Sequence, residues 1–297
     1  MQDVVLAIDA GGTSSRAALI DLGGSCLGFG IAGSGNPTSA GFPAALDSLA
    51  AATAAALDTA GVQDGFSAAT IAMAGASRRF RPDDIAVALR PLGLRGAVTV
   101  EPDLLAMYYS GTTDPDGHVL VAGTGSVSAR IEHGTLAQVA DGLGWLLGDR
   151  GSGYWIGHRV VRAVAGAIDG VRPSTALTGL LLGALEVDLA LAPDPAAGRP
   201  QVLQDLLDRI YPTRPVELAR FAPIAFSAAA AGDDIARGIL AAAAAGLAET
   251  LATVRRPGSP GPVVLGGSVL TALLTGDESL VRPLSTAIPP SDRIPAQ

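Results

Sequence analysis

The chain alternates short apolar runs of strand length with longer, alanine-rich segments of helical length. Strands are expected at residues 4–8, 69–76, 97–100 and 263–265, and strand hairpins at residues 3–31 and 118–131. Helices are expected at residues 43–60, 78–90, 104–109, 154–168, 174–191, 200–211, 216–231 and 233–254. Because strands and helices are interspersed rather than segregated, the pattern predicts an α/β protein.

The first apolar run ends in Asp9 and continues into a turn of small residues. Gly11 and Gly12 permit a positive φ and a close approach of the backbone, and Thr13 adds a hydroxyl beside exposed N–H groups. This composition suits phosphate oxygens, and a carboxylate beside them at Asp9 indicates a cation such as Mg²⁺ between the two. The alternative for this segment alone is a plain hairpin turn without a ligand.

The same pattern recurs about a hundred residues later, where the hairpin at 118–131 contains the turn Gly123-Thr124-Gly125. A third glycine turn, Gly266-Gly267-Ser268, follows the run at 263–265. Two such hairpins indicate an internally duplicated chain. We expect two similar domains, residues 1–113 and residues 114–297, each offering a phosphate-binding turn to a shared cleft.

The chain has no lysine, so all 20 basic residues are arginines. Walker A loops, protein kinases and Schiff-base enzymes each need a lysine, which excludes them. Phosphoryl transfer would therefore depend on backbone amides, hydroxyls, a metal or arginine. The histidines, His118, His133 and His158, have neither metal spacing nor a nucleophile elbow nearby, and we interpret them as ordinary surface or helix residues.

The net charge is −8 at pH 7 without a basic stripe, so nucleic acid is not expected as a partner. Cys26 is the only cysteine, which excludes an internal disulfide and a cysteine-ligated zinc or iron–sulfur site within one chain. No export signal is visible, and charged residues interrupt the most apolar regions, 176–192 and 224–252, which favours core helices over membrane spans. A reducing cytosol is the expected location.

Two aspartates stand at junctions where two roles compete. Asp103 follows the strand at 97–100 and precedes a helix, where it is either an N-cap or a catalytic base that accepts a proton from an attacking hydroxyl. Asp149 lies in the glycine-rich segment 140–158, which also holds both tryptophans. It either caps the helix near Tyr154 or binds the hydroxyls of a sugar whose ring an aromatic face covers.

Two further segments are rich in small residues. Residues 28–33 match the dinucleotide fingerprint G-x-G-x-x-G, but no helix opens directly after the third glycine. A glycine-bearing strand is therefore the better interpretation. Residues 229–232, which precede the last long helix, offer small side chains against which a flat base could pack.

Taken in order, these motifs resemble those of N-acetylglucosamine kinases, within the BadF/BadG/BcrA/BcrD-type ATPases of the actin-like, hexokinase-related superfamily. The resemblance covers nearly the whole chain and is carried by Asp9-Ala10-Gly11-Gly12-Thr13, Asn36, Asp103, Gly123-Thr124-Gly125-Ser126, Gly148-Asp149-Arg150-Gly151-Ser152-Gly153-Tyr154-Trp155 and Gly266-Gly267-Ser268. It implies two ribonuclease-H-like (actin-like ATPase) domains, with mixed sheets flanked by helices and a cleft between them. The implied activity is ATP-dependent phosphorylation of the 6-hydroxyl of an amino sugar, with N-acetylglucosamine as the leading acceptor.

The resemblance also implies a role for each matching residue. Asp9 would hold Mg²⁺ through water, and Asp103 would be the catalytic base, which reverses the preference for a cap. ATP would be bound by Gly11, Gly12, Thr13, Gly123, Thr124, Gly125, Ala229, Gly266, Gly267 and Ser268. The sugar would contact Asn36, Gly75, Asp103, Gly142 and Asp149. A homodimer in the cytoplasm is the expected form.

Several positions depart from the family pattern. Arg150 stands where a glutamate is usual, and Val127 where some relatives have asparagine. Glucosamine and N-acetylmuramic acid therefore remain alternative acceptors, the latter with an arginine such as Arg78 or Arg150 for its lactyl group. A non-catalytic sugar-binding regulator is disfavoured by Asp103 and by the lack of a basic helix-turn-helix. Relatives usually end in a Gly/Ala-rich helix, whereas residues 289–297 are rich in proline, so that helix is either truncated or replaced by another closure of the first domain.

Overall fold

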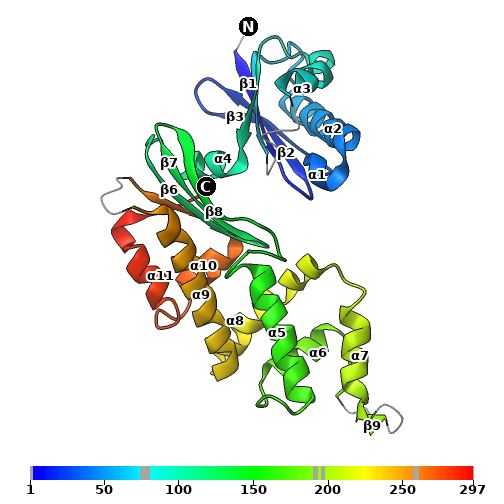
Figure 1. Ribbon diagram of the computed structural model, residues 1–297. Coiled ribbons are helices and arrows are strands. Elements are labelled where there is room, and N and C mark those ends of the chain that lie inside the picture. Colours follow the sequence, from blue (N-terminus) through cyan, green and yellow to red (C-terminus); the bar gives the residue numbers. More distant parts are fainter. Residues whose placement is uncertain (1–2, 74–80, 190–192, 195–197, 257–260, 297) are drawn as a thin grey trace. The chain divides into compact units, whose positions relative to one another are not determined.

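The computed structural model describes residues 3–73, 81–189, 193–194, 198–256 and 261–296. The chain divides into two compact units, residues 1–109 and 110–297, each with its own sheet (Figure 1). Each unit also has its own apolar core. The boundary between the units lies in the last turn of helix α4 (Asp103–Gly111). The boundary expected between residues 113 and 114 lies in the loop that follows this helix.

The first unit is built on a five-stranded mixed sheet with the order β3-β2-β1-β4-β5. Its strands are β1 (Val4–Ala10), β2 (Ser15–Asp21), β3 (Cys26–Ala32), β4 (Ala68–Met73) and β5 (Val98–Pro102). The first three form an antiparallel meander, whereas β4 and β5 run parallel to β1. Parallel strands end at the same edge of a sheet, so the carboxyl ends of β1, β4 and β5 lie together.

The helices of the first unit are α1 (Pro37–Ala40), α2 (Phe42–Ala60), α3 (Pro82–Leu89), the 3₁₀ turn η1 (Arg90–Leu92) and α4 (Asp103–Gly111). The long helix α2 packs directly on β2 and β3. A Cβ at Gly28 or at Gly30 would lie 2.2 Å from a backbone oxygen of α2. The fingerprint glycines therefore let a helix approach a strand, which confirms the strand interpretation of residues 28–33.

The second unit repeats this topology, with the sheet order β12-β11-β6-β7-β8. Its strands are β6 (Gly117–Ala122), β7 (Ser126–Glu132), β8 (Thr135–Asp141), β11 (Val263–Gly266) and β12 (Arg293–Pro295). Again three strands form an antiparallel meander, and two later strands run parallel to the first. The shared topology confirms the internal duplication. The proline-rich end of the chain becomes the edge strand β12 of the second sheet.

The remaining elements of the second unit are mostly helical. They are α5 (Gly153–Ile168), α6 (Leu177–Ala184), the short pair β9 (Pro193–Asp194) and β10 (Arg199–Pro200), α7 (Gln201–Ile210), η2 (Pro215–Phe221), α8 (Ala222–Ala230), α9 (Asp234–Val254), α10 (Ser268–Thr275), α11 (Arg282–Ala287) and η3 (Pro290–Asp292). Two expected helices are shorter. The helix expected at 174–191 ends at Ala184, since Glu186 has a positive φ of 55°. The one expected at 216–231 splits into η2 and α8, and Pro223 lies in the first turn of α8.

Helix α9 is long and apolar enough to cross a membrane by length and composition, and within the described residues no other helix is. Half of its most apolar window is buried inside the protein, and the helix packs against β6, β7 and β8. This packing fits the core helix expected from the charged residues in the segment.

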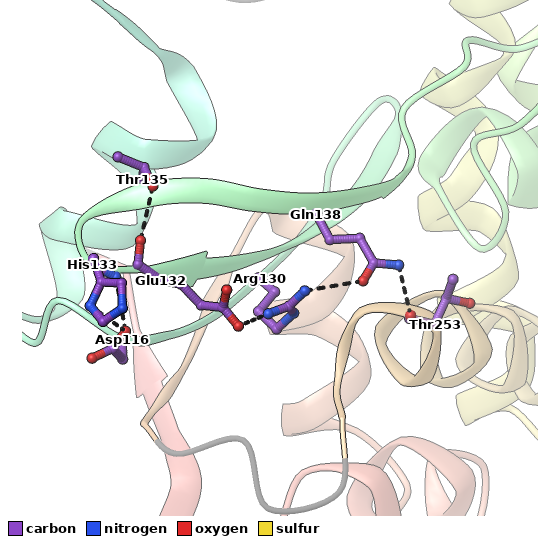
Figure 2. A network of polar contacts seen from close by, with 7 residues as sticks. All are labelled: Asp116, Arg130, Glu132, His133, Thr135, Gln138 and Thr253. Carbon is purple, nitrogen blue, oxygen red and sulfur yellow. Dashed lines mark hydrogen bonds and ion pairs between the residues drawn. The ribbon is translucent and has the colours of Figure 1, made fainter.

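A polar network at the hairpin end of β7 and β8 surrounds a buried arginine (Figure 2). The side chain of Arg130 is 3% exposed and forms an ion pair with Glu132. Gln138 Oε1 lies 3.5 Å from Arg130 Nη2, and Gln138 Nε2 donates to the Thr253 carbonyl at 3.1 Å. These contacts tie the second sheet to α9.

The interpretation of His118 as a surface or helix residue is wrong. This residue lies on β6 opposite Arg130 and has no exposed surface. Alternation along a strand of only six residues is too short a pattern to show that both sheet faces are covered. Burial lowers the pKa of His118 to about 4, and the nearby Arg255 and Arg130 charges act in the same direction.

Candidate active site

The first glycine turn closes the hairpin between β1 and β2. The Gly11 N–H donates to the Ser14 carbonyl at 3.0 Å, and a Cβ at Gly11 would lie 2.9 Å from that same oxygen. The turn is therefore too tight for a larger residue. Within the described chain, the N–H groups of Gly12 and Thr13 have no acceptor, which leaves two donors for an anion.

Asn36 lies directly beside this turn. Ser34 Oγ donates to the Gly11 carbonyl at 3.3 Å, and a Cβ at Gly35 would lie 2.4 Å from Ser15 Oγ. The loop before α1 is thus pressed onto the turn, and it carries Asn36, which is 8% exposed. Gly75, another expected sugar contact of this unit, lies outside the described residues.

Asp9 and Asp103 lie at the carboxyl edge of the first sheet, at the ends of β1 and β5. Asp9 is 57% exposed, and its Oδ2 lies 3.7 Å from Arg16 Nη1. Burial raises the pKa of Asp103, and the negative charge of Asp9 raises it further. The electrostatic coupling shows that the two carboxylates are near each other. A carboxyl group with a raised pKa is a stronger base than an ordinary one.

Asp103 also accepts the N–H of Leu104 at 2.9 Å. A typical N-cap accepts from the residue two or three positions further on, so this bond to the next residue is not the standard cap. The bond lowers the pKa of the Asp103 carboxyl, but burial has the larger effect. One oxygen of Asp103 thus anchors the side chain at the start of α4.

The second glycine turn joins β6 to β7 and is hydrogen-bonded to the start of α5. The Gly123 N–H donates to the Gly125 carbonyl at 2.9 Å. The first amides of α5, those of Gly153 and Tyr154, donate to the Gly123 and Thr124 carbonyls at 2.7 and 3.1 Å. The N–H groups of Thr124 and Gly125 have no acceptor among the residues that the structure describes. Both turns therefore offer unused donors.

Asp149 supports this second turn. It has a positive φ of 59° and is only 7% exposed, and its Oδ1 accepts the Ser126 N–H at 3.1 Å. The cap of α5 is Ser152, which accepts the Trp155 N–H at 3.1 Å, so the capping interpretation of Asp149 is wrong. Burial raises the pKa of the Asp149 carboxyl, the Ser126 bond lowers it, and the charge of Asp141 raises it.

The third glycine turn lies beside the second. Gly267 has a φ of 98°, and a Cβ there would lie 2.3 Å from the Ala122 carbonyl and 2.9 Å from the Gly123 nitrogen. The segment Gly266-Gly267-Ser268 therefore packs directly against the end of β6, and Ser268 begins α10. Ala229, the remaining expected adenosine contact, is buried in α8.

The two tryptophans differ in what surrounds them. The indole of Trp155 is covered by Arg159, whose guanidinium carbon lies 3.1 Å from the ring centroid. Trp145 is 42% exposed and packs edge-on against Tyr154, with the ring centroids 6.0 Å apart. Of the two, Trp145 has the more accessible aromatic face.

Comparison with known proteins identifies the family. The model of the BadF/BadG/BcrA/BcrD ATPase family matches residues 6–281. The chain belongs to the BadF/BadG/BcrA/BcrD ATPase family. This membership confirms the resemblance drawn from the glycine turns and the segment at 148–155.

The individual relatives of this chain are distant in sequence. The chain is 32% identical over 160 residues to the N-acetyl-D-glucosamine kinase of Dictyostelium discoideum, covering 52% of this chain and 46% of that protein. It is 26% identical over 262 residues to the glucosamine kinase of Vibrio cholerae, covering 87% of this chain and 83% of that protein. The chain thus spans less than half of the first relative and most of the second.

A solved structure of similar fold comes from Chromobacterium violaceum, a protein provisionally described as an N-acetylglucosamine kinase. Its TM-score is 0.71 at 23% identity, and the alignment covers 100% of this chain and 95% of that one. Together with the family match and the duplicated sheets, this likeness confirms the expected pair of ribonuclease-H-like domains.

The structure gathers the expected residues of this family in two groups. In the first unit, Asn36 lies beside the turn at residues 11–13, and Asp9 is coupled to Asp103. In the second unit, the turns at 123–125 and 266–268 adjoin each other, and Asp149 contacts the turn at 123–125. Sequence reasoning gave no role to Ser34 and Ser126, which join these loops, because a serine in a glycine-rich loop has no distinctive signal.

Proposed function

We propose that this protein is an ATP-dependent kinase that transfers the γ-phosphate to the 6-hydroxyl of N-acetyl-D-glucosamine. The observation that carries the proposal is Asp103, a carboxylate with a raised pKa at the same sheet edge as Asp9 and in the same unit as a turn with unused N–H donors. The names of the two relatives, both amino sugar kinases, support the choice of acceptor.

In this proposal the first unit supplies the base and part of the sugar contacts. Asp103 accepts the proton of the 6-hydroxyl as that oxygen attacks phosphorus. Asn36 contacts the sugar, and the N–H groups of Gly12 and Thr13 bind terminal phosphate oxygens, while Gly11 closes the turn that presents them. Donors fixed before the reaction stabilise charge on the transferred group without having to reorganise.

The second unit supplies the remaining contacts. The turn at 123–125 binds phosphate oxygens, while Ala229 and the turn at 266–268 line the adenosine. Asp149 and Gly142 contact the hydroxyls of the sugar and the side of the sugar that carries the N-acetyl amide. Alignment of the hydroxyl with the γ-phosphate supplies much of the rate.

Magnesium is part of the proposal through Asp9. No group of three or more His, Cys, Asp or Glu side chains within the described ranges is placed to hold a metal. A single exposed carboxylate fits Mg²⁺, which keeps most of its waters and is bound through one or two carboxylates and the substrate phosphates. When bound, Mg²⁺ neutralises charge on the phosphate oxygens.

An ADP-release assay tests the proposal. The purified protein, with ATP and with or without Mg²⁺, is offered N-acetylglucosamine, N-acetylmannosamine, glucosamine, glucose and N-acetylmuramic acid. The highest kcat/KM is expected for N-acetylglucosamine, with the phosphate on the 6-oxygen. If none of these sugars is phosphorylated, the proposal is wrong and a non-catalytic sugar-binding role takes its place.

Replacement of Asp103 tests the base. We expect Asp103→Asn to lower kcat by about 10²- to 10⁴-fold while the KM for ATP stays near that of the wild type. The base must be ionised, and burial raises its pKa. As the pH falls, wild-type activity should therefore be lost at a higher pH than an ordinary aspartate would give. Asp21→Asn is the matched control, since Asp21 accepts the Ser25 N–H at 2.8 Å at the opposite end of β2. Near-normal turnover of the Asp103 variant would remove the base assignment.

Glucosamine is the second candidate acceptor. The alignment with the Vibrio cholerae glucosamine kinase covers more of this chain than the alignment with the Dictyostelium kinase. A free amine would favour an additional carboxylate near the 2-position of the sugar. The same panel separates the two acceptors by their kcat/KM values. A homodimer in the cytoplasm completes the proposal and rests on the family resemblance.

A further inference from the structure

Asp141 ends β8 in a left-handed backbone conformation, with a φ of 64°. Its carboxylate accepts two successive backbone N–H groups, Oδ1 from Asp149 at 2.6 Å and Oδ2 from Arg150 at 2.9 Å. Hydrogen bonds to an ionised acceptor are roughly twice as strong as bonds between neutral groups. One side chain therefore fixes the backbone of the turn that carries Asp149.

The neighbouring glycines fit this contact. A Cβ at Gly148 would lie 2.1 Å from Asp141 Oδ1, so the carboxylate occupies the space that a side chain would need. Gly142 has a φ of 69°, and its N–H donates to the Ser126 carbonyl at 3.0 Å. The chain thus turns out of β8 while the Asp141 carboxylate stays on the turn at residues 148–150.

Asp149 and Arg150 are in turn hydrogen-bonded to Ser126, which follows the turn at residues 123–125. Asp149 Oδ1 accepts the Ser126 N–H, and Ser126 Oγ donates to the Arg150 carbonyl at 2.8 Å. A Cβ at Gly125 would lie 2.8 Å from Asp149 Oδ1. Displacement of residues 149 and 150 would therefore move the Asp149 carboxylate and the start of β7 together.

We propose that Asp141 is a positioning residue for the reaction, which holds the Asp149–Arg150 backbone so that the Asp149 carboxylate meets the sugar hydroxyls. The inference rests on the proposed function, because that proposal assigns Asp149 to the sugar. Asp141 itself does not touch the substrate and acts through Asp149.

Charge gives a signature that a purely structural role lacks. The negative charge of Asp141 raises the pKa of Asp149, in addition to the effect of burial. Removing that charge lowers the pKa, so the Asp149 carboxylate stays ionised to a lower pH. Sugar binding that needs the ionised form should then persist to a lower pH in a variant without the charge.

The test compares Asp141→Asn and Asp141→Gly with the wild-type enzyme. Asparagine removes the charge and places an NH₂ group against one of the two N–H groups. Glycine removes the whole contact but favours the left-handed backbone, so this variant is expected to fold. We expect kcat/KM for the sugar to fall about tenfold to a hundredfold in both, with a small change in the KM for ATP. The acid limb of the pH profile of sugar binding, where binding is lost as the pH falls, should move to lower pH.

Asp116→Asn is the matched control. Asp116 lies just before β6 and accepts the His133 N–H at 2.9 Å, so it also fixes a turn residue of positive φ, at the other end of the same strands (Figure 2). This variant should lose thermal stability without any change in sugar KM or in the acid limb.

A double-mutant cycle decides whether Asp141 acts through Asp149. The double variant Asp141→Asn, Asp149→Asn should be no worse than Asp149→Asn alone. Additive losses, or folded Asp141 variants that match the Asp116 control, would overturn the inference while the wild-type enzyme stays active. A wild-type enzyme without activity on any amino sugar would overturn the proposed function, and this inference with it.

Discussion

At the scale of single residues, His118 shows how strongly position changes chemistry. It lies on β6 with no exposed surface, next to Arg130 and within the field of Arg255. A histidine that must stay neutral between two arginines costs stability whenever the solution would protonate it. Its neighbour Arg130, by contrast, forms an ion pair with Glu132.

This burial predicts a pH dependence of folding stability. The pKa of His118 falls from 6.5 to about 4 on folding, so the unfolded chain binds the proton more tightly. The free energy of unfolding should therefore decrease as pH falls from 6.5 towards 4, by about 3 kcal/mol at most from this residue. Urea unfolding of the wild type and of His118→Asn at several pH values measures the difference in slope.

The control for that slope is His133→Asn, because the His133 side chain is 94% exposed. Its removal should leave the pH dependence unchanged. If the His118 and His133 variants keep the slope of the wild type, the histidine on β6 is not the group that titrates.

At the scale of elements, the contact between α2 and β3 depends on two glycines. A Cβ at Gly30 would lie 2.2 Å from the Ala52 carbonyl and 2.6 Å from the Ala56 nitrogen. Both are backbone atoms of α2, so no side-chain rotation can relieve the clash. The helix would have to move away from the strand, and the core between them would loosen.

We therefore expect Gly30→Ala to destabilise the protein by about 1–3 kcal/mol or more, the usual cost of overpacking a core. The matched control is Gly238→Ala in α9, where a Cβ would meet nothing within 4 Å. There the replacement should stabilise the helix by about 1 kcal/mol. Thermal unfolding followed by circular dichroism compares the two, and equal melting temperatures would contradict the packing argument.

At the scale of the whole molecule, the chain contains two separate apolar cores. One is formed by residues between Val4 and Val98, and the other by residues between Leu120 and Ile288. Because each core is built around its own sheet, we expect the two units to unfold separately.

Calorimetry should show this independence. We expect the calorimetric enthalpy of unfolding of the ligand-free protein to exceed the van't Hoff enthalpy, since two units do not melt as one cooperative block. Gly30→Ala should then lower the transition of the first unit and leave that of the second in place. A single transition with equal enthalpies, shifted as a whole by the variant, would contradict two independent units.

The sequence by itself determined the local features of this protein. The strand-turn-strand pattern at residues 4–20 and 118–131, the glycines that tight turns require, and the duplication were all visible, because strand length and turn chemistry depend on adjacent residues. The fold class followed, and the order of the motifs identified the family. The positions of Asp9 and Asp103 at strand ends were likewise visible in the sequence.

Only the tertiary structure decided which groups meet across long stretches of chain. Asp149 binds the Ser126 N–H rather than capping α5, His118 is enclosed, and residues 293–295 complete the second sheet. Each of these depends on pairing between segments far apart in sequence, which sets burial and hydrogen-bond partners without a local pattern. Asp141 is the clearest case, because its role exists only where a left-handed backbone brings its carboxylate to the turn at residues 148–150.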